Sequence, residues 1–552
     1  MLFPIPPSKG LHMIRYTSER QLPLDGFLLP FGGTLNPSNR WVKLSHIIPW
    51  DDLVKGYHDK MTSGHGRPAK NGRLVIGAVI IKHKLNLSDE ETVLQIQENP
   101  YLQYFIGFSR YQDKPPFVPS LFVEIRRRMG SEVFDIFEKA IFSKLEASRP
   151  KKVVAKKSPP DSAPGSGGSG AEEPVASVDC HSRENGSVRK AEGTSVESAG
   201  DHQGKLIIDA TVANQAIKYP TDLGLLNESR EISEKLIDDL AMESGHKKPR
   251  MYREQARKRY LNLAKNKKPG KKLLRQGLRQ QLQYLRRNLS HIDQLLDTFE
   301  KFPLSARNQK LYWVIQQVYA QQFEMYRSKT NRCNDRIVSI SQPHVRPIVR
   351  GKAGHKVEFG AKISVSLVDG VARIDNLSWD AFNEGQDLQA QVENYKSRYG
   401  CYPEVVLADG IYGTRVNRKF LKEEGIRFGG KPLGRPKKQT ALNAEEIKKA
   451  KAQRKQDARE RIPIEGKFGQ GKNGYRLNYI RARTVKTAEA WIRSIFLVMN
   501  LLLLSRIFHA LRMIVEKCSF WRYFLGRLLS LQLESESLRL NMVQSFGMRM
   551  IF

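Results

Sequence analysis

The sequence predicts an α/β protein in which a mixed sheet flanked by helices follows an all-α N-terminal domain. Three observations support this fold class. Apolar residues recur at helical spacing through roughly the first 150 residues, and short apolar strands alternate with helical segments after residue 204. A long, basic, helical stretch separates the first of these strands from the others, so the sheet is expected to carry a large helical insertion.

The composition favours a partner with many negative charges. The chain has 552 residues, with 92 Lys and Arg against 57 Asp and Glu, which gives a formal net charge of +35. A globular protein this positive most often binds a polyanion, although a merely basic or ribosome-associated protein is the alternative. The four cysteines are too far apart for a CxxC zinc pair and suit a reducing cytosol. Charge alone does not separate an enzyme from a coating protein.

One apolar stretch, residues 491–515, could be either a membrane span or a buried core helix. Arginine, asparagine and histidine interrupt it, and a bilayer span tolerates such residues poorly. We therefore expect a buried core helix and no membrane contact, which together with the scattered cysteines favours a cytoplasmic protein.

The N-terminal part is predicted to be an irregular segment, residues 1–40, followed by a helical DNA-binding domain, residues 41–148. An apolar stripe at helical spacing runs from Leu74 to Ile81. Ser88-Asp-Glu-Glu91 is a capping box that begins a further helix, and Asn99-Pro100 ends it.

Two segments are set apart by their composition or position. Residues 149–203 are poor in apolar residues and rich in Ser, Gly, Pro and Ala, so they cannot bury enough surface to offset their ordering entropy. They are predicted to be a disordered linker. Residues 516–552 are predicted to form a helical tail.

Residues 204–515 are predicted to be the α/β domain. Lys205–Asp209 is a short buried strand that ends in a carboxylate. The segment of about 227–345 carries runs of cations in its first half and apolar helical spacing in its second. Packed helices with a basic face explain both halves, and a simply solvated basic face is the alternative for the cations.

Strands and helices alternate after the insertion. Two strands joined by an Asp-Gly turn are followed by a helix, a strand, a helix and a strand, at Lys362–Val368, Val371–Leu377, Asp387–Tyr399, Glu404–Asp409, Asn417–Glu424 and Ile426–Phe428. Residues 432–458 are polar and basic and are expected to be mobile. Glu465 then opens an apolar helical region that extends to about residue 530.

Three acids are the candidates for chemistry: Asp209, Asp409 and Glu465. The two aspartates are each predicted to end a strand, where side chains project into the crevice beyond a sheet. Attack on a phosphodiester requires an activated oxygen and neutralised phosphate charge, and two divalent ions about 4 Å apart supply both. Mg²⁺ prefers carboxylates, waters and substrate oxygens, so three acids are enough.

The surroundings of Glu465 strengthen this interpretation. Arg461, Glu465 and Lys472 fall at i, i+4 and i+11, which share one helical face. A carboxylate between two cations in so basic a chain suggests a metal-dependent phosphate site. The simpler alternative is that Arg461 only pairs with Glu465.

These motifs also carry a family resemblance. The blocks Asp209–Leu226 (DATVANQAIKYPTDLGLL), Ala408–Arg418 (ADGIYGTRVNR) and Arg461-x₃-Glu465-x₆-Lys472 resemble those of the DDE transposases of bacterial insertion sequences, in particular the insertion-sequence-five group. The motifs IPW, GRPA and ENPYL between residues 48 and 102 are similar to the N-terminal domain of the same proteins. The family's glutamate signature has a tyrosine three residues before the arginine, where this chain has Ala458.

The resemblance implies a ribonuclease-H-like fold with a helical insertion. It further implies that Asp209, Asp409 and Glu465 ligate two Mg²⁺ or Mn²⁺ ions, and that the partner is double-stranded DNA, both the terminal inverted repeats and the target. A homodimer is expected in the DNA complex, because two DNA ends must be brought together. The candidate DNA contacts are Arg461, Lys472, Arg415, Arg67, Arg126 and Arg127.

Two other functions remain open. One is a structure-selective nuclease on the same fold. Such an enzyme needs less recognition surface than the N-terminal domain and the basic insertion provide, which argues against it. The other is a non-catalytic DNA-binding protein descended from a transposase. Such a protein does not need an intact acid triad, so the presence of all three acids argues against it.

Overall fold

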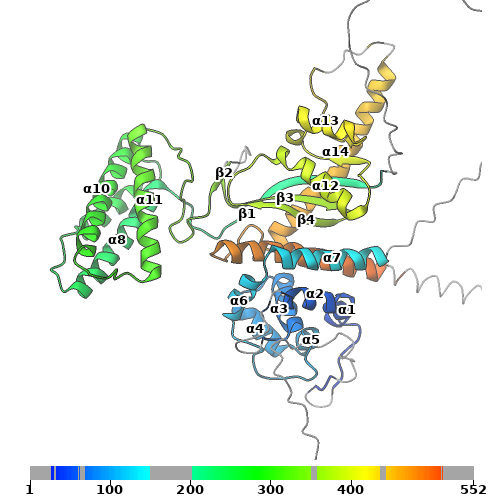
Figure 1. Ribbon diagram of the computed structural model, residues 1–552, viewed down its shortest axis with the longest axis horizontal. Helices are drawn as coiled ribbons and strands as arrows, with labels where there is room; N and C mark the ends of the chain where they lie inside the picture. The colour runs from blue at the N-terminus through cyan, green and yellow to red at the C-terminus, as the bar shows by residue number, and fades with distance from the viewer. Residues whose placement is uncertain are drawn as a thin grey trace, which may run out of the picture.

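The computed structural model describes residues 27–29, 33–59, 69–148, 202–349, 357–435 and 443–510, with the single positions 61, 440 and 513. The predicted tail, most of the predicted irregular segment and the predicted linker up to residue 201 lie outside these residues. Figure 1 shows three bodies: an N-terminal helical domain, an α/β core and a helical arm that projects from the core.

The N-terminal domain is all-helical, as predicted. Its helices are α1 (Arg40–Ile47), α2 (Trp50–His58), α3 (Gly72–Leu85), α4 (Asp89–Glu98), α5 (Pro100–Phe105), α6 (Leu121–Arg128) and α7 (Ser131–Ser148). The predicted capping box begins α4, because Ser88 Oγ accepts a hydrogen bond from the Glu91 amide at 3.0 Å. Asn99 ends α4 and at the same time caps α5, which begins at Pro100.

The core is a mixed sheet with the order β4-β3-β1-β5-β6, and β2 pairs with the start of β3. The strands are β1 (Lys205–Asn214), β2 (Pro347–Val349), β3 (Val357–Val368), β4 (Val371–Ser378), β5 (Val405–Leu407) and β6 (Arg427–Phe428). Strand β3 is antiparallel to both β1 and β4, whereas β1, β5 and β6 are mutually parallel. The predicted mixed α/β class is confirmed.

Strand β1 is longer than predicted. It continues past Asp209 to Asn214 because antiparallel pairing with β3 runs without a break from Ile207, opposite Leu367, to Asn214, opposite Gly360. Asp209 therefore lies inside a strand and not at its end. The residues after Asp209 are too small and mixed in polarity for the strand to be recognised from sequence alone.

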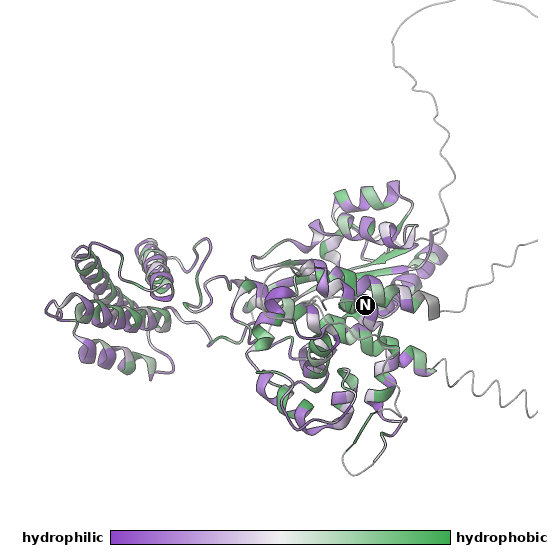
Figure 2. Ribbon diagram, turned by 60° about the horizontal axis from the view of Figure 1, so that its bottom comes forward, coloured by the Kyte–Doolittle hydropathy of each residue, from purple (hydrophilic) through white to green (hydrophobic). Residues whose placement is uncertain are grey.

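Helices cover both faces of the sheet. On one face, Ile363 and Val365 of β3 pack against Ile464 and Phe468 of α14 (Ala444–Gly474) and against the helix Val485–Ala510. On the other face, Leu206 and Ile208 of β1 pack against α12 (Leu388–Tyr399) and α13 (Arg415–Glu423). Figure 2 shows the hydrophobic strands enclosed by helices whose outer surfaces are hydrophilic.

Helix α14 corrects one prediction. Residues 444–458 were expected to be mobile, but they form the first half of a helix that continues through Pro463. This half consists largely of Ala, Glu, Lys, Gln and Arg, which are strong helix formers. Asp457 anchors it to the sheet edge by a two-point ion pair with Arg427 of β6, at 2.7 and 2.9 Å. The polar residues of this segment therefore belong to an exposed helix, and the prediction of a mobile segment is wrong here.

Val485–Ala510 is, among the described residues, the one helix long and apolar enough to cross a membrane. Most of it is buried in this structure, between the sheet and the N-terminal domain. Asn500, one of the residues that interrupts the apolar stretch, exchanges two hydrogen bonds with the backbone of Ala372 in β4, at 2.7 and 3.1 Å. These contacts agree with the predicted core helix.

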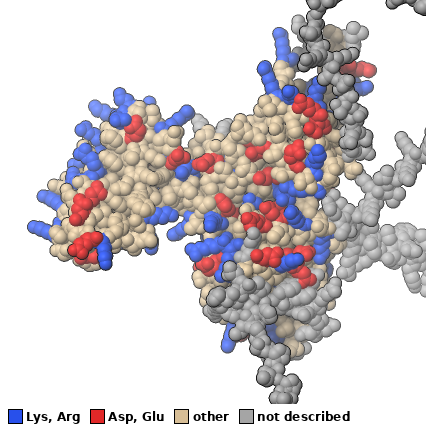
Figure 3. Space-filling model, in the orientation of Figure 1, with Lys and Arg blue, Asp and Glu red and all other residues tan. Residues whose placement is uncertain are grey.

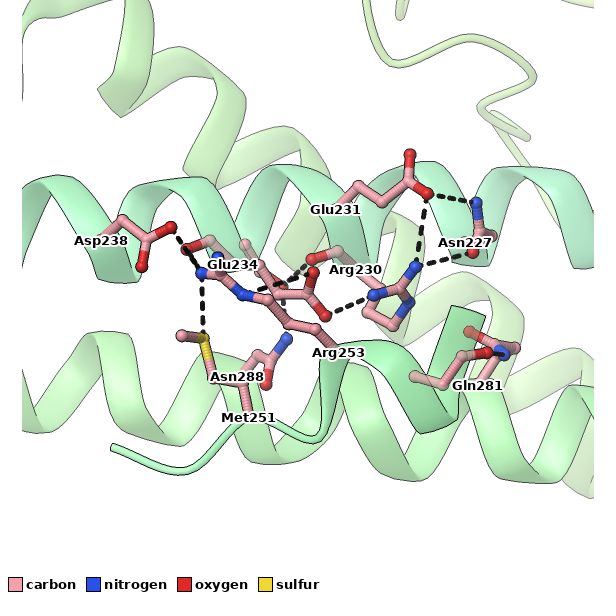
Figure 4. Close-up of polar contacts among 11 residues, drawn as sticks. Asn227, Arg230, Glu231, Glu234, Asp238, Met251, Arg253, Gln281 and Asn288 are labelled. Carbon is pink, nitrogen blue, oxygen red and sulfur yellow. Dashed lines mark hydrogen bonds and ion pairs between the residues drawn. The ribbon is translucent and has the colours of Figure 1, made fainter. Parts of the chain in front are cut away.

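The insertion between β1 and β2 is a helical bundle with its own apolar core. Its helices are α8 (Asp222–Ser244), α9 (Arg253–Ala264), α10 (Lys271–Leu296) and α11 (Ala306–Ser328), so it begins slightly earlier than predicted. Figure 4 shows a polar network inside it: buried Arg230 pairs with Glu234 and Asn227, and Arg253 of α9 donates to the Glu234 carbonyl at 2.8 Å. Most of the cations lie on the outside (Figure 3).

Candidate active site

Asp209 in β1 and Asp409 just after β5 lie near each other, because β1 and β5 are paired parallel strands. The register pairs Ile207 of β1 with Leu407 of β5, so two further residues along each chain place the aspartates side by side. Asp409 follows the end of β5, as predicted, and its Oδ1 accepts a hydrogen bond from the Gly410 amide at 2.6 Å. This bond caps the short helix η5 (Gly410–Tyr412). The two aspartates, 200 residues apart in the sequence, are thus close together in the fold.

Glu465 approaches from α14 and is connected to Asp209 through Arg461. The Arg461 guanidinium places Nη1 3.4 Å from Asp209 Oδ2 and donates from Nη2 to Glu465 Oε1 at 2.6 Å. Both nitrogens belong to one planar group, so the two carboxylate oxygens are at most about 8 Å apart. The pairing of Arg461 with Glu465 is therefore present, and Arg461 also contacts a second acid.

Asp209 is in a strongly acidic environment. Burial raises the pKa of its carboxyl above the ordinary value, and the neighbouring carboxylates of Glu384 and Asp409 raise it further. The Ala210 amide, 2.8 Å from Asp209 Oδ1, and the Arg461 guanidinium oppose this shift in pKa. Acids gathered in this way repel one another and favour a bound cation.

Glu384 is a nearby acid that the sequence did not single out. It lies in the short helix η4 (Glu384–Gln386), where Lys362 of β3 holds its carboxylate at 2.9 Å. No local pattern marks it, because its approach to Asp209 depends on how the loop after β4 folds back over the sheet. Its proximity to Asp209 makes it a further candidate for the site.

Asn417 joins the two turns that carry Glu384 and Asp409. Its buried side-chain amide donates to the carbonyl of Gly385 at 2.6 Å and to that of Tyr412 at 2.8 Å. These bonds tie η4 to η5 and hold both acids at the same edge of the sheet. Asn417 belongs to the second sequence block, and this contact gives it a positioning role.

The candidate DNA-contact residues are in unlike environments. Arg415 is exposed in the first turn of α13, and Lys472 lies 3.4 Å from Glu358 of β3. Arg127 is exposed and pairs with Glu124, whereas Arg126 is buried and forms a two-point ion pair with Asp89, at 2.8 and 3.0 Å. Arg67 lies outside the described residues.

Arg126 is more buried than its place in the sequence suggested. Its guanidinium is held by the Asp89 carboxylate and packs 5.1 Å from the Trp491 ring of the core. Its position in a cluster of three arginines, Arg126–Arg128, indicated surface charge, but the helical spacing turns Arg126 inward while Arg127 and Arg128 stay exposed.

Comparison with known proteins gives matches over both parts of the chain. Residues 406–502 match the family model described as "Transposase DDE domain", and residues 31–128 match the one described as "Transposase domain (DUF772)". The first segment contains Asp409, Arg461, Glu465 and Lys472. In these two segments the chain is similar to transposases, and in the first of them to their DDE domain. The fold of its core is accordingly ribonuclease-H-like, with the matched segment beginning in β5.

A curated relative is similar to part of the chain. It is the Rhizobium meliloti protein named "Uncharacterized protein ORF8 in nfe locus", which is 37% identical over 109 residues. The matched part is 19% of this chain, and the chain spans about half of the relative, 51% of its length. No solved structure matches the chain.

The side chains of the site fit divalent ions in kind, but they are not arranged as a finished metal site. Carboxylate oxygens are the ligands that Mg²⁺ and Mn²⁺ prefer. Among the described residues, no group of three His, Cys, Asp or Glu side chains is positioned to hold a metal ion. Glu465 is instead paired with Arg461, whose positive charge lies between Glu465 and Asp209.

Proposed function

We propose that the chain is a DNA transposase that catalyses metal-dependent strand cleavage and strand transfer at the ends of an insertion sequence. The observation that carries the proposal is that Arg461 connects Asp209 of β1 to Glu465 of α14, while Asp409, just after β5, is close enough to raise the pKa of Asp209. The similarity of residues 406–502 to a transposase DDE domain, and of residues 31–128 to a second transposase domain, supports the same conclusion.

Asp209, Asp409 and Glu465 would hold two Mg²⁺ or Mn²⁺ ions. When bound, such ions supply activation of the attacking oxygen and stabilisation of the leaving oxygen. A swing of the Glu465 side chain away from Arg461 would bring its carboxylate to the two aspartates. Arg461 would then be free to form a two-point contact with a DNA phosphate, and Lys472 and Arg415 would add positive charge along the strand.

The substrate would be double-stranded DNA, first at the terminal inverted repeats and then at the target. A water would attack a phosphodiester at the element's end, and the freed 3′-hydroxyl would attack target DNA. Two ends must meet for this reaction, so the active complex is proposed to contain a homodimer. The net charge of +35 suits such a partner in the cytoplasm.

The proposal is tested by a strand-transfer assay with duplexes that carry the ends of the DNA element encoding the chain. Joined products that require Mg²⁺ or Mn²⁺ are expected. Asp209→Asn keeps the size of the side chain but weakens its metal binding, so it should reduce product by roughly a hundredfold or more while DNA binding persists. Hydrolysis without joining would indicate the nuclease alternative, and binding without cleavage the non-catalytic one. Activity that survives Asp209→Asn would overturn the assignment of the first acid.

A further inference from the structure

A cavity of about 240 Å³ lies between the N-terminal domain and the segment that follows α14. Lys82 of α3 and Arg126 of α6 line it from one side, and Arg476, Arg481 and Trp491 line it from the core. Figure 3 shows Lys and Arg side chains gathered where these two bodies meet. We call this space the junction cavity.

Positive charge exceeds negative charge around the junction cavity. Its lining contains four cationic side chains, of Lys82, Arg126, Arg476 and Arg481, against the two acids Asp89 and Glu90. Asp89 is already bound by Lys82 at 2.9 Å and by Arg126 at 2.8 Å. Among the ion pairs of the described residues, none involves Arg476 or Arg481. The excess charge at the cavity therefore favours an anion.

Two buried donors at the junction cavity have no acceptor. Arg126 Nε and Trp491 Nε1 are both inaccessible to solvent and form no hydrogen bond, and each residue is only 8% exposed. Both groups donate and neither can accept. Buried donors without a partner are uncommon in folded proteins, because the loss of hydration is not compensated. Because neither atom is open to a water-sized probe, both lie behind the surface of the cavity, and an anion would reach them only after a shift of the side chains.

Three neighbouring side chains pack against the Trp491 ring. Lys82 Nζ lies 4.6 Å and the Arg126 guanidinium 5.1 Å from the ring centre, and the His83 ring packs against it edge-on at 5.6 Å. Burial and the neighbouring cations hold the pKa of His83 well below its usual range, so His83 contributes no charge at neutral pH. The wall of the cavity is therefore rigid as well as cationic.

The junction cavity lies within reach of DNA at the candidate active site. Helix α14 carries Glu465 and ends at Gly474, next to Tyr475, which also lines the cavity. At a rise of 1.5 Å per residue, the stretch from Glu465 to Tyr475 is about 15 Å long, which is the length of roughly four base pairs of duplex. Lys472 lies between the two sites on the same helix.

We propose that the junction cavity binds a backbone phosphate of the DNA about four base pairs from the scissile bond. This inference rests on the proposed function, because the phosphate is one of the same DNA. It gives the contact between N-terminal domain and core a role in binding DNA. Both bodies would have to be docked for the phosphate to be held.

The test measures DNA affinity of the full chain by fluorescence anisotropy, with a labelled element-end duplex at several salt concentrations. Arg481→Ala should weaken binding by roughly fivefold to tenfold at 0.1 M salt and lower the salt slope by about one. Trp491→Phe removes the unpartnered N–H but keeps a ring, and should weaken binding; its unfolding midpoint, measured in parallel, shows whether the folded state is retained under the assay conditions. The matched control is Arg483→Ala, an exposed cation two residues from Arg481 that does not line the cavity.

The outcomes separate this inference from the proposed function. Equal losses for Arg481→Ala and Arg483→Ala would reflect general charge and would overturn it. Unchanged DNA affinity in both Arg481→Ala and Trp491→Phe would also overturn the inference. If cleavage is intact in these variants, the proposed function is unaffected. If inorganic phosphate changes the tryptophan fluorescence of the wild type but not of Trp491→Phe, while DNA affinity is unaffected by Arg481→Ala, the cavity takes a free anion and not DNA. No DNA binding by the wild type would contradict the proposed function itself.

Discussion

Arg461 supplies the positive charge between two acids of the candidate site. Its guanidinium contacts Asp209 at 3.4 Å and Glu465 at 2.6 Å. The pair with Glu465 was predictable from the sequence, because residues four apart share a helical face. The contact with Asp209, from a strand 252 residues earlier, was not, since no local signal sets how α14 packs on the sheet. The same limit applies to Glu384.

Removal of the Arg461 charge should make divalent ions bind more tightly. Arg461 competes with a cation for Asp209 and Glu465, and a partly exposed ion pair contributes up to about 1 kcal/mol. Arg461→Gln should therefore lower the Kd for Mn²⁺ by a few-fold, as measured by electron paramagnetic resonance. Product formation should fall, because the proposed phosphate contact is lost. Arg459→Gln, at an exposed neighbouring position, should change neither quantity. Weaker Mn²⁺ binding in Arg461→Gln would show that Arg461 supports the ion and does not compete with it.

Helix α14 is the element in which sequence and structure differ most. The sequence predicted a helical face for Arg461 to Lys472, despite Pro463 and several glycines, but missed the helix between residues 444 and 458. The second half is held by burial of Ile464 and Phe468 against the sheet, which outweighs poor propensity. The first half depends on good propensity and ion pairs. Composition alone had suggested a mobile segment because it contains few apolar residues.

Substitution of Gly469 tests whether the glycines in the second half of α14 lower its stability but let DNA approach its backbone. A Cβ at Gly469 would meet nothing within 4 Å, so Gly469→Ala should raise the free energy of unfolding by about 0.5–1 kcal/mol in urea denaturation. At buried Gly471 a Cβ would lie 3.2 Å from Leu477, so Gly471→Ala should gain less. If DNA approaches the bare backbone, Gly469→Ala will also weaken DNA binding. Destabilisation by Gly469→Ala would contradict the helical geometry described for this half.

At the scale of the whole molecule, the N-terminal domain docks on the core through the helix Val485–Ala510 and through α7. Arg373 of β4 pairs with Glu138 of α7 at 3.0 Å across this contact. The sequence predicted the helical domain, the insertion and the α/β core in the right order, because composition and periodicity are local. It did not predict which surfaces meet, because docking depends on residues hundreds of positions apart. The junction cavity was for the same reason invisible in the sequence.

The docked contact should make stability depend on pH. Burial raises the pKa of the Glu138 carboxyl from 4.5 to about 7, although Arg373 opposes the shift. A carboxyl whose pKa is higher in the folded chain binds its proton more tightly there, so it stabilises the fold below pH 4.5 and loses this effect as pH rises to 7. The free energy of unfolding should fall by up to roughly 3 kcal/mol over this window and then level off.

Glu138→Gln should remove that part of the pH dependence, because the amide does not titrate. Urea denaturation of both chains between pH 5 and 8 measures it. Parallel pH profiles for wild type and variant would rule out Glu138 as the group responsible.

The proposed joint metal site of Asp209, Asp409 and Glu465 is tested most directly by cleavage of the protein backbone by bound iron. Fe²⁺ takes the place of Mg²⁺ or Mn²⁺, and radicals formed with ascorbate and peroxide cut the chain next to the ion. We expect fragments that end close to all three acids, fewer of them when Mn²⁺ competes, and none in Asp209→Asn. Cuts near only one of the three acids, or a pattern that Asp209→Asn leaves unchanged, would contradict a shared site.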